Sequence, residues 1–229
     1  MSRRNNASVR CQRCRLHRSL CLCSLIPRLE TRTRLVLIIH RREDRKSTNT
    51  GRLAVECLPN SEVIVRGDVE SYPELPAAWS PAAQPLLLFP EADAIPLARF
   101  AASSRPVTLV VPDGTWRQAS KVRQRIPWLR DVPSVSIEHD APTAYRLRKE
   151  IRDQGLATME AIARAFGVLE GASVRTAMEG VLRVLVERTL WSRGRMEKAA
   201  VFGGIPEGVV RHDPRSGSPN DQDGVGRGD

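Results

Sequence analysis

The sequence has few aromatic residues and no long apolar run. Phe, Trp and Tyr make up 4% of its 229 residues, which argues against a sheet surface that stacks RNA bases. No apolar run approaches the roughly 20 residues that a membrane span requires, and the N-terminal residues lack the apolar core of a signal peptide. Internal repeats, glycine-rich phosphate loops and dinucleotide fingerprints are also absent. We therefore expect a cytoplasmic protein with no membrane partner.

The positive charge of the chain lies near its N-terminus. The formal net charge is +10, and residues 1–46 hold 13 of the 36 Lys and Arg but 3 of the 26 Asp and Glu, so the remainder is neutral. A concentrated positive charge suits a polyanion, because each neutralised phosphate releases counterions. The alternative is a solvated arm without a partner. With 41% hydrophobic residues, the rest of the chain suits one globular domain.

Four of the five cysteines lie within thirteen residues. Cys11-x-x-Cys14 and Cys21-x-Cys23 offer two pairs of thiols, and such a cluster in a reducing cytosol favours a metal site over disulfides. Four thiolates satisfy the tetrahedral preference of zinc. His17 lies between the pairs and is the reserve ligand; the alternative is a solvated or RNA-facing side chain.

The predicted zinc knuckle is rich in arginine. Arg13, Arg15 and Arg18 lie among the cysteines, so an ordered knuckle would present guanidinium groups to phosphate. We expect three parts in the chain: a basic, Cys-rich knuckle over residues 1–30, an α/β domain over 31–211 and a disordered tail over 212–229, where apolar residues nearly vanish.

Short apolar runs alternate with stretches of helical periodicity, a pattern typical of a largely parallel α/β sheet with helices on both faces. The predicted strands are residues 34–40, 62–66, 85–89, 107–111 and 135–138. The predicted helices are residues 52–58, capped by Asn49 or Thr50, then 157–169 and 174–191, with a further helix after residue 115.

Residues 107–125 are expected to form a strand, an acidic turn and a helix. Pro112 should end the strand because it supplies no ladder donor, and Asp113-Gly114 should form the turn. One face of the predicted helix carries Arg117, Lys121 and Arg125; the other carries Trp116, Ala119, Val122 and Ile126.

Asp113 should therefore stand at the carboxyl ends of the strands, where open α/β sheets bind ligands. The alternative is that Asp113 only caps the following helix and that Trp116 is a core residue. Likewise, Thr158 could be a simple N-cap, and Glu160 could only favour the helix dipole.

Taken together, the motifs resemble the DTW-domain family, the tRNA-uridine aminocarboxypropyltransferases. The matching residues are Cys11, Cys14, Cys21 and Cys23; His40 and Glu43 with Asn49-Thr50-Gly51; Asp113-Gly114-Thr115-Trp116; Tyr145 with Arg148; and Thr158-Met159-Glu160-Ala161. Two positions depart from the pattern, since Arg41 stands where relatives often carry proline and Ala157 where they often carry serine.

The resemblance implies a SPOUT-like domain whose knotted C-terminal part binds S-adenosylmethionine. It also implies transfer of the 3-amino-3-carboxypropyl group to N3 of a uridine in tRNA, with release of methylthioadenosine. Such a reaction needs a base for N3, and we hypothesise that Asp113 takes this proton; it could instead anchor the uracil or the cofactor.

The other expected roles follow the same resemblance. Candidates for binding the cofactor are Thr115, Trp116, Tyr145, Arg148, Thr158 and Glu160, with Arg148 pairing with its carboxylate. Candidates for contacting RNA are Arg13, Arg15, Arg18, His40, Arg41, Arg42, Asn49, Arg117 and Lys121; of these, His40 and Asn49 could instead shape the pocket. Two functions stay open as alternatives: a SPOUT-type RNA methyltransferase and a non-catalytic zinc-knuckle RNA-binding protein.

Overall fold

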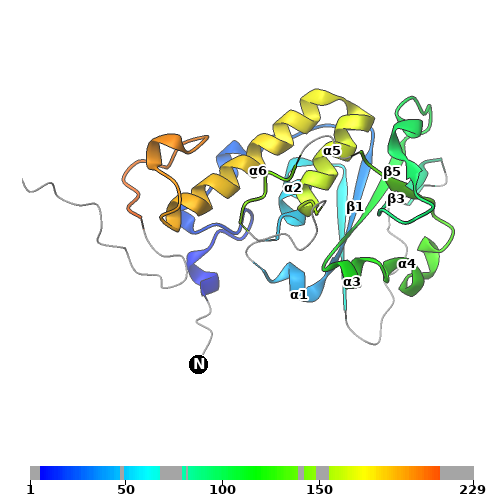
Figure 1. The fold of residues 1–229 in the computed structure, drawn as a ribbon, viewed down its shortest axis with the longest axis horizontal. Helices are drawn as coiled ribbons and strands as arrows, with labels where there is room; N and C mark the ends of the chain where they lie inside the picture. Colours follow the sequence, from blue (N-terminus) through cyan, green and yellow to red (C-terminus); the bar gives the residue numbers. More distant parts are fainter. Residues whose placement is uncertain are drawn as a thin grey trace, which may run out of the picture.

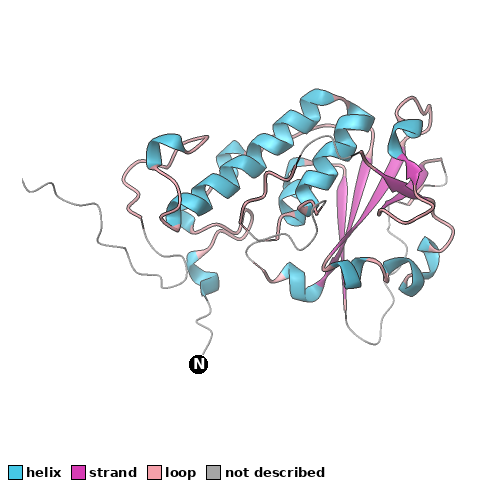
Figure 2. Cartoon of the chain, viewed as in Figure 1, coloured by secondary structure: helices cyan, strands magenta, loops and turns pink. Residues whose placement is uncertain are grey.

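A six-stranded parallel sheet forms the centre of the protein in a computed structural model, which describes residues 6–46, 49–67, 79–80, 82–138, 142–147 and 155–211 (Figures 1 and 2). The spatial order is β2-β1-β5-β3-β6-β4, and each neighbouring pair is parallel. The strands are β1 (Arg34–His40), β2 (Ser61–Arg66), β3 (Gln84–Leu88), β4 (Ile95–Pro96), β5 (Val107–Asp113) and β6 (Ser134–Ser136). The predicted parallel α/β class is confirmed.

Helices cover both faces of the sheet, as predicted. The α-helices are α1 (Arg41–Asp44), α2 (Gly51–Cys57), α3 (Trp116–Ala119), α4 (Val122–Arg125), α5 (Thr158–Glu170) and α6 (Ala172–Ser192). Short 3₁₀ helices are η1 (Asn6–Val9), η2 (Arg18–Leu20), η3 (Cys23–Leu25), η4 (Leu97–Phe100), η5 (Pro127–Leu129) and η6 (Lys198–Ala200). Helices α2, α5 and α6 pack on one face, whereas α4 and η5 pack on the other.

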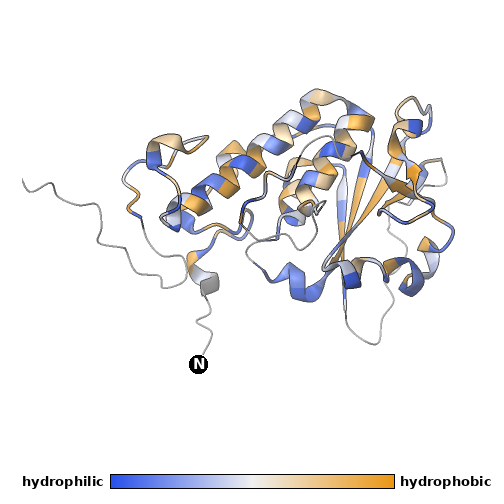
Figure 3. Ribbon diagram, in the orientation of Figure 1, coloured by the Kyte–Doolittle hydropathy of each residue, from blue (hydrophilic) through white to orange (hydrophobic). Residues whose placement is uncertain are grey.

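Strand β1 shows why the sheet is buried on both sides. Its side chains alternate between two hydrophobic clusters: Leu35 and Leu37 contact the α2, α5 and α6 layer, while Val36 and Ile38 contact the α4 and η5 layer. All four are fully buried, because successive residues of a strand point to opposite faces and a central parallel strand is covered on both. Figure 3 shows the same contrast between apolar strands and the hydrophilic α1.

The prediction that Pro112 ends the strand is wrong. Strand β5 continues to Asp113, with Pro112 in register with Ile38 of β1. The pairing of β5 with β3 ends at Leu87 opposite Val110. Beyond that pair β5 has only one neighbouring strand, and a strand paired on one side tolerates proline.

The helix expected after residue 115 is interrupted. Helix α3 ends at Ala119 and α4 begins at Val122, so the predicted basic face is not one continuous stripe. Val122 is buried as expected, but 40% of Trp116 is exposed. The alternative that Trp116 is a core residue is therefore wrong.

The Cys-rich segment packs onto the main domain. Cys14, Leu16, Leu20 and Leu22 are buried and belong to the same hydrophobic cluster as α6. Residues 212–229, the predicted tail, lie outside the described residues, and the knot and the boundary at residue 30 stay predictions. Among the described helices, none combines the length and the apolar character needed to cross a bilayer.

Candidate active site

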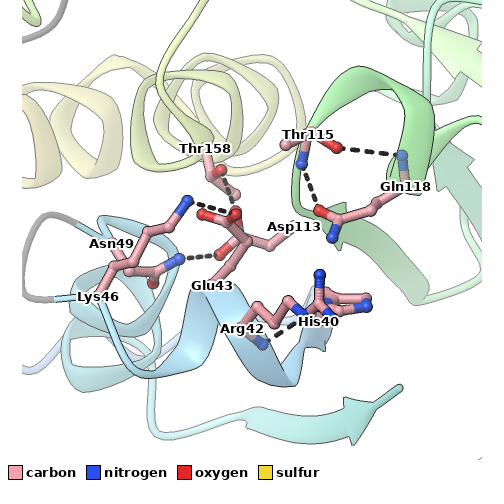
Figure 4. Close-up of polar contacts among 9 residues, drawn as sticks. All are labelled: His40, Arg42, Glu43, Lys46, Asn49, Asp113, Thr115, Gln118 and Thr158. Carbon is pink, nitrogen blue, oxygen red and sulfur yellow. Dashed lines mark hydrogen bonds and ion pairs between the residues drawn. The ribbon is translucent and has the colours of Figure 1, made fainter. Parts of the chain in front are cut away.

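A buried carboxylate lies at the carboxyl edge of the sheet. Asp113 ends β5 with 6% of its surface exposed. The Asn49 amide Nδ2 donates a hydrogen bond to Oδ2 of Asp113 at 2.5 Å, and the Thr158 hydroxyl donates one to Oδ1 at 2.6 Å (Figure 4). Each oxygen of the carboxylate is thus oriented by a separate donor from a distant part of the chain.

Local structure fixes the direction of both donors. Asn49 lies just before α2, and its Oδ1 accepts the backbone N–H of Arg52 at 3.2 Å. That bond assigns oxygen and nitrogen in the amide, so the nitrogen faces Asp113. Thr158 is the first residue of α5. Of the two predicted caps of α2, Thr50 holds the N-cap position but makes no side-chain cap bond, and Asn49 supplies the side-chain oxygen.

Gly51 allows the carboxylate to lie against the start of α2. A Cβ at this position would stand 2.6 Å from Oδ2 of Asp113 and 3.2 Å from Cδ1 of Leu37. Such contacts are shorter than a side chain tolerates, so a residue larger than glycine would displace Asp113.

Asp113 is not the cap of the following helix. Thr115 is the N-cap of α3: its Oγ1 accepts the Gln118 N–H at 3.3 Å, and the Gln118 side chain accepts the Thr115 N–H at 2.8 Å (Figure 4). This reciprocal pair is a capping box. The capping alternative for Asp113 is therefore wrong, and its carboxylate is left to face Asn49 and Thr158.

An apolar pocket of about 150 Å³ adjoins the carboxylate. It opens at the ends of β3, β5 and β6, and Thr158 both lines it and bonds to Asp113. The rings of Phe89 and Trp116 lie 5.5 Å apart. The lining residues are Leu88, Phe89, Pro90, Val111, Pro112, Gly114, Trp116, Ala119, Val135, Ser136, Ile137, Leu156, Thr158 and Ala161.

The predicted cofactor residues are only partly gathered at this pocket. Trp116 and Thr158 line it, whereas Thr115 is exposed beside it in the capping box. Tyr145 is 2% exposed. Arg148 lies outside the described residues.

Glu160 holds the segment that leads to Tyr145. Its carboxylate accepts hydrogen bonds from the Thr143 hydroxyl at 2.6 Å, the Ala144 N–H at 2.6 Å and the Ala157 N–H at 2.8 Å. Three donors at a buried carboxylate tie residues 143–144 to the start of α5. Cofactor binding by Glu160 and Tyr145 stays a prediction.

The predicted RNA contacts separate into three groups. His40, Arg41 and Arg42 lie at the end of β1 and the start of α1, and Asn49 is buried in the carboxylate site. Arg117 is exposed and Lys121 half-buried at the break between α3 and α4. The third group, Arg13, Arg15 and Arg18, lies in the knuckle.

Arginines of the knuckle are engaged with acidic residues of the main domain. Nε of Arg13 lies 2.8 Å from Oε2 of Glu56, and a guanidinium nitrogen of Arg15 lies 3.8 Å from Oδ1 of Asp44. Arg18 is exposed. Two of the three predicted phosphate contacts therefore already have carboxylate neighbours.

The four clustered cysteines converge. Their Sγ atoms all lie within 4.8 Å of one another, with 3.4 Å between Cys11 and Cys23 and 3.8 Å between Cys14 and Cys21. A tetrahedral zinc with bonds of about 2.3 Å needs sulfur atoms about 3.8 Å apart. These donors fit such an ion. His17 instead bonds to Ser19 at 2.8 Å, outside the sulfur cluster.

The thiols differ in acidity. Burial raises the pKa of Cys11, but hydrogen bonds with the backbone of Cys14 and Arg13 and with the Cys23 and Cys21 thiols together outweigh it and lower this pKa to about 7. Burial raises the pKa of Cys14 to about 11 and that of Cys57, which is fully buried away from the cluster, to about 12. Cys57 is thus apolar filling, as expected.

Arg188 of α6 was missed by sequence reasoning. It is 4% exposed and donates to four carbonyl oxygens: those of Leu20 at 3.2 Å, Cys21 at 2.7 Å, Gly203 at 3.0 Å and Gly204 at 2.9 Å. In the sequence, Arg188 stands at an ordinary helical position that gives no signal of this role. Its contacts join the Cys-rich segment to α6 and to the segment after η6.

Comparisons with known proteins agree with this architecture. The DTW domain model matches residues 8–190. The chain is 31% identical over 168 residues to tRNA-uridine aminocarboxypropyltransferase 2 of Macaca fascicularis, covering 70% of this chain and 56% of that protein. It is 28% identical over 172 residues to the Drosophila melanogaster protein of the same name, covering 72% and 68%.

The mouse protein of that name is 30% identical over 168 residues, covering 70% of this chain and 56% of the relative. The chain thus spans little more than half the length of the macaque and mouse relatives. No solved structure matches it significantly. The family model covers well over half of the sequence, and the chain belongs to the DTW domain family.

Proposed function

We propose that the protein transfers the 3-amino-3-carboxypropyl group of S-adenosylmethionine to N3 of a uridine in tRNA. The observation that carries this proposal is the oriented Asp113 carboxylate, joined through the Thr158 hydroxyl to an apolar pocket. A proton acceptor that is separated by one side chain from a pocket for the group donor suits a group-transfer reaction. The names of the DTW relatives supply the substrate class.

In the proposed reaction Asp113 accepts the N3 proton of the uridine. The N3 electron pair then attacks the γ-carbon of the methionyl chain, the bond from this carbon to sulfur breaks, and methylthioadenosine leaves. Asn49 and Thr158 keep the Asp113 carboxylate from turning away from the uracil, because each donates a hydrogen bond to one of its oxygens. Such fixed orientation is a large part of enzymatic rate enhancement.

The pocket suits the apolar part of the donor. At about 150 Å³ it is smaller than the roughly 300–1,000 Å³ of most ligand sites, so we assign it to the adenine or methylthio portion, beside Trp116. The aminocarboxypropyl arm would then extend toward Thr158 and Asp113. Which carbon lies in line with N3 decides which group is transferred.

The proposed substrate must be unpaired or flipped, because N3 lies on the base-pairing edge. The positive charge of the chain supports tRNA as the partner. Unpaired cysteines suit a reducing compartment, which supports a cytoplasmic location.

We also infer that Cys11, Cys14, Cys21 and Cys23 hold one structural zinc ion. Its chemistry would be to fix four thiolates in a tetrahedron and so order the segment. The spacing of the four sulfur atoms supports this assignment. Zinc content measured by mass spectrometry should be close to one ion per chain and should fall to background in a Cys11→Ser/Cys14→Ser variant; unchanged content would refute the site.

Labelled donor tests the proposed reaction. The protein is incubated with unmodified tRNA and S-adenosylmethionine labelled either in the carboxyl carbon or in the methyl group. We expect carboxyl label in tRNA, a matching amount of methylthioadenosine and no methyl label. Methyl label alone would establish a methyltransferase instead, and tRNA binding without donor consumption would establish a binding protein.

The Asp113→Asn variant tests the base. It keeps the size of the side chain but removes the proton acceptor, so tRNA and donor binding should persist while transfer falls at least 100-fold. Normal transfer by this variant would show that Asp113 is not the base.

A further inference from the structure

A second polar cluster lies at the sheet edge beside Asp113. His40 and Arg66 are in register at the ends of β1 and β2. On the other side of β1, Ile39 is in register with Asp113. Neighbouring strands lie about 4.8 Å apart, and β2 and β5 lie on opposite sides of β1. The backbone of Arg66 is therefore about 10 Å from β5, the strand that carries Asp113.

Arg66 is a buried cation. It is 8% exposed and donates a hydrogen bond to the carbonyl of Gln118 at 2.5 Å. Its Nε has no hydrogen-bond partner among the described residues. That Nε atom is itself shielded from solvent, so only the Nη groups of Arg66 can reach a ligand. A guanidinium held in place through one Nη group suits an anion with several acceptor oxygens.

His40 adds a second donor at the same strand ends. Its Nδ1 accepts the Arg42 N–H at 3.2 Å, so in the neutral ring Nε2 carries the hydrogen (Figure 4). Nε2 lies 3.1 Å from where a Cβ on Gly67 would be. This contact places the ring over the residue that follows Arg66.

Among the described residues around His40 and Arg66, positive side chains outnumber carboxylates, although Glu43 acts on His40 in the opposite sense. Burial and then Arg125 lower the pKa of Arg66, and burial and then Arg66 and Arg42 lower that of His40. Within the described ranges, Arg42, Arg66 and Arg125 form no ion pair with a carboxylate. Glu43, which follows Arg42 in the sequence, forms an ion pair with Lys46, with 2.5 Å between Oε1 and Nζ.

The knuckle differs in this respect, because Arg13 pairs with Glu56 and Arg15 lies near Asp44. Like charges brought together without counter-charges are costly unless a ligand of opposite charge binds. The strand-end cluster is thus better suited to phosphate than the knuckle is.

We propose that His40, Arg42, Arg66 and Arg125 form a phosphodiester-binding site, which holds the tRNA backbone next to the uridine presented to Asp113. The inference rests on the proposed function for the identity of the polyanion. It adds Arg66 and Arg125 to the RNA contacts expected from the sequence, and it makes the sheet edge, rather than the knuckle, the main phosphate contact.

Binding of tRNA over a range of salt concentrations, without donor, tests this site. The variants are Arg66→Gln and the double variant Arg42→Gln/Arg125→Gln; the matched control removes two knuckle charges, Arg13→Gln/Arg18→Gln. We expect each site variant to weaken binding at least 10-fold and to reduce the slope of log K against log salt by about 0.7–0.9 for each phosphate that is no longer neutralised. The knuckle control should change affinity less than threefold.

Two further measurements keep the outcome clear. Arg66→Lys preserves the charge and should restore most of the salt slope, which a purely structural role of Arg66 would not require. Thermal unfolding should show that the Arg42→Gln/Arg125→Gln chain is folded, since both side chains lie on the surface.

Unchanged binding by the double variant, or an equal loss of affinity in the knuckle control, would overturn the proposed site. Failure of the proposed function gives a different result. In that case tRNA binding still depends on the cluster, but no carboxyl label reaches tRNA.

Discussion

Gly51 has no side chain, and replacing it with alanine should disturb the Asp113 carboxylate site. The added Cβ would stand 2.6 Å from Oδ2 and 3.2 Å from Cγ of Asp113. On the other side it meets Cδ1 of Leu37, also at 3.2 Å. Since Leu37 is fully buried, the strain falls mainly on the carboxylate.

The loss in the free energy of unfolding can be estimated from these distances. To reach an ordinary contact of 3.4 Å, Oδ2 must move by about 0.8 Å, which can lengthen its 2.5 Å hydrogen bond to Asn49 to about 3.3 Å and so weaken it. Losing one hydrogen bond to a charged group costs about 1.5–3 kcal/mol. Alanine in place of a helical glycine contributes about 0.5–1 kcal/mol in the other direction, so the free energy of unfolding falls by at most about 0.5–2.5 kcal/mol.

Two assays check this prediction. The melting temperature should fall by about 2–4 °C for each kcal/mol of stability removed, and the transfer rate should fall on the order of 100-fold, the effect of a misplacement near 1 Å. Gly180→Ala in α6 is the matched control, because its Cβ would meet only Phe202, at 3.9 Å. The control should gain about 0.4–1 kcal/mol and keep full activity. A Gly51→Ala protein as stable and active as its parent would refute the tight packing around Asp113.

Three more changes have definite expected results. Thr158→Val removes one donor to Asp113 and should lower the transfer rate at least 10-fold while tRNA affinity stays constant in a binding assay. Arg188→Met should lower the free energy of unfolding by about 2–4 kcal/mol in denaturant titrations, because four carbonyl groups lose their donor. The control Arg28→Met removes an ion pair with Glu30 whose side chains are 77% and 72% exposed, and it should cost less than 1 kcal/mol. Burial and then Arg66 lower the pKa of His40, so the folded state binds its proton less well than the unfolded state, and stability should fall as the pH drops below about 6.5. His40→Gln should lose less stability than the parent between pH 7.5 and 5.5; an equal loss would show that other groups cause it.

The sheet could be predicted because buried parallel strands are continuous apolar runs. The strand predicted over residues 34–40 has the same bounds as β1, and the helix predicted over 174–191 differs from α6 by two residues at its start and one at its end. The errors arose where a tertiary neighbour decides the local structure. Pro112 stays in the strand because β3 no longer pairs there, which no local signal reports.

The site shows the same division. Sequence reasoning placed Asp113 at the strand ends, but Asp and Thr are both good N-caps, and nothing local showed that Thr115 takes this role with Gln118. The partners of Asp113 lie 64 and 45 residues away, at Asn49 and Thr158. Contacts over such separations depend on the fold as a whole, so the chemistry of each residue was predictable and its partner was not.

Charge counting was the least reliable guide to where RNA would bind. The excess in residues 1–46 pointed to the knuckle, yet Arg13 and Arg15 lie beside acidic residues of the main domain. Arg66 comes from the part of the chain that is neutral overall, and the fold brings it next to His40. Net charge over a segment describes long-range attraction, whereas a phosphate site needs cations that the protein itself leaves without counter-charges. Among the described residues, Arg42 and Arg66 meet that condition, so neutralising them should reduce tRNA affinity more than removing an equal charge from the knuckle.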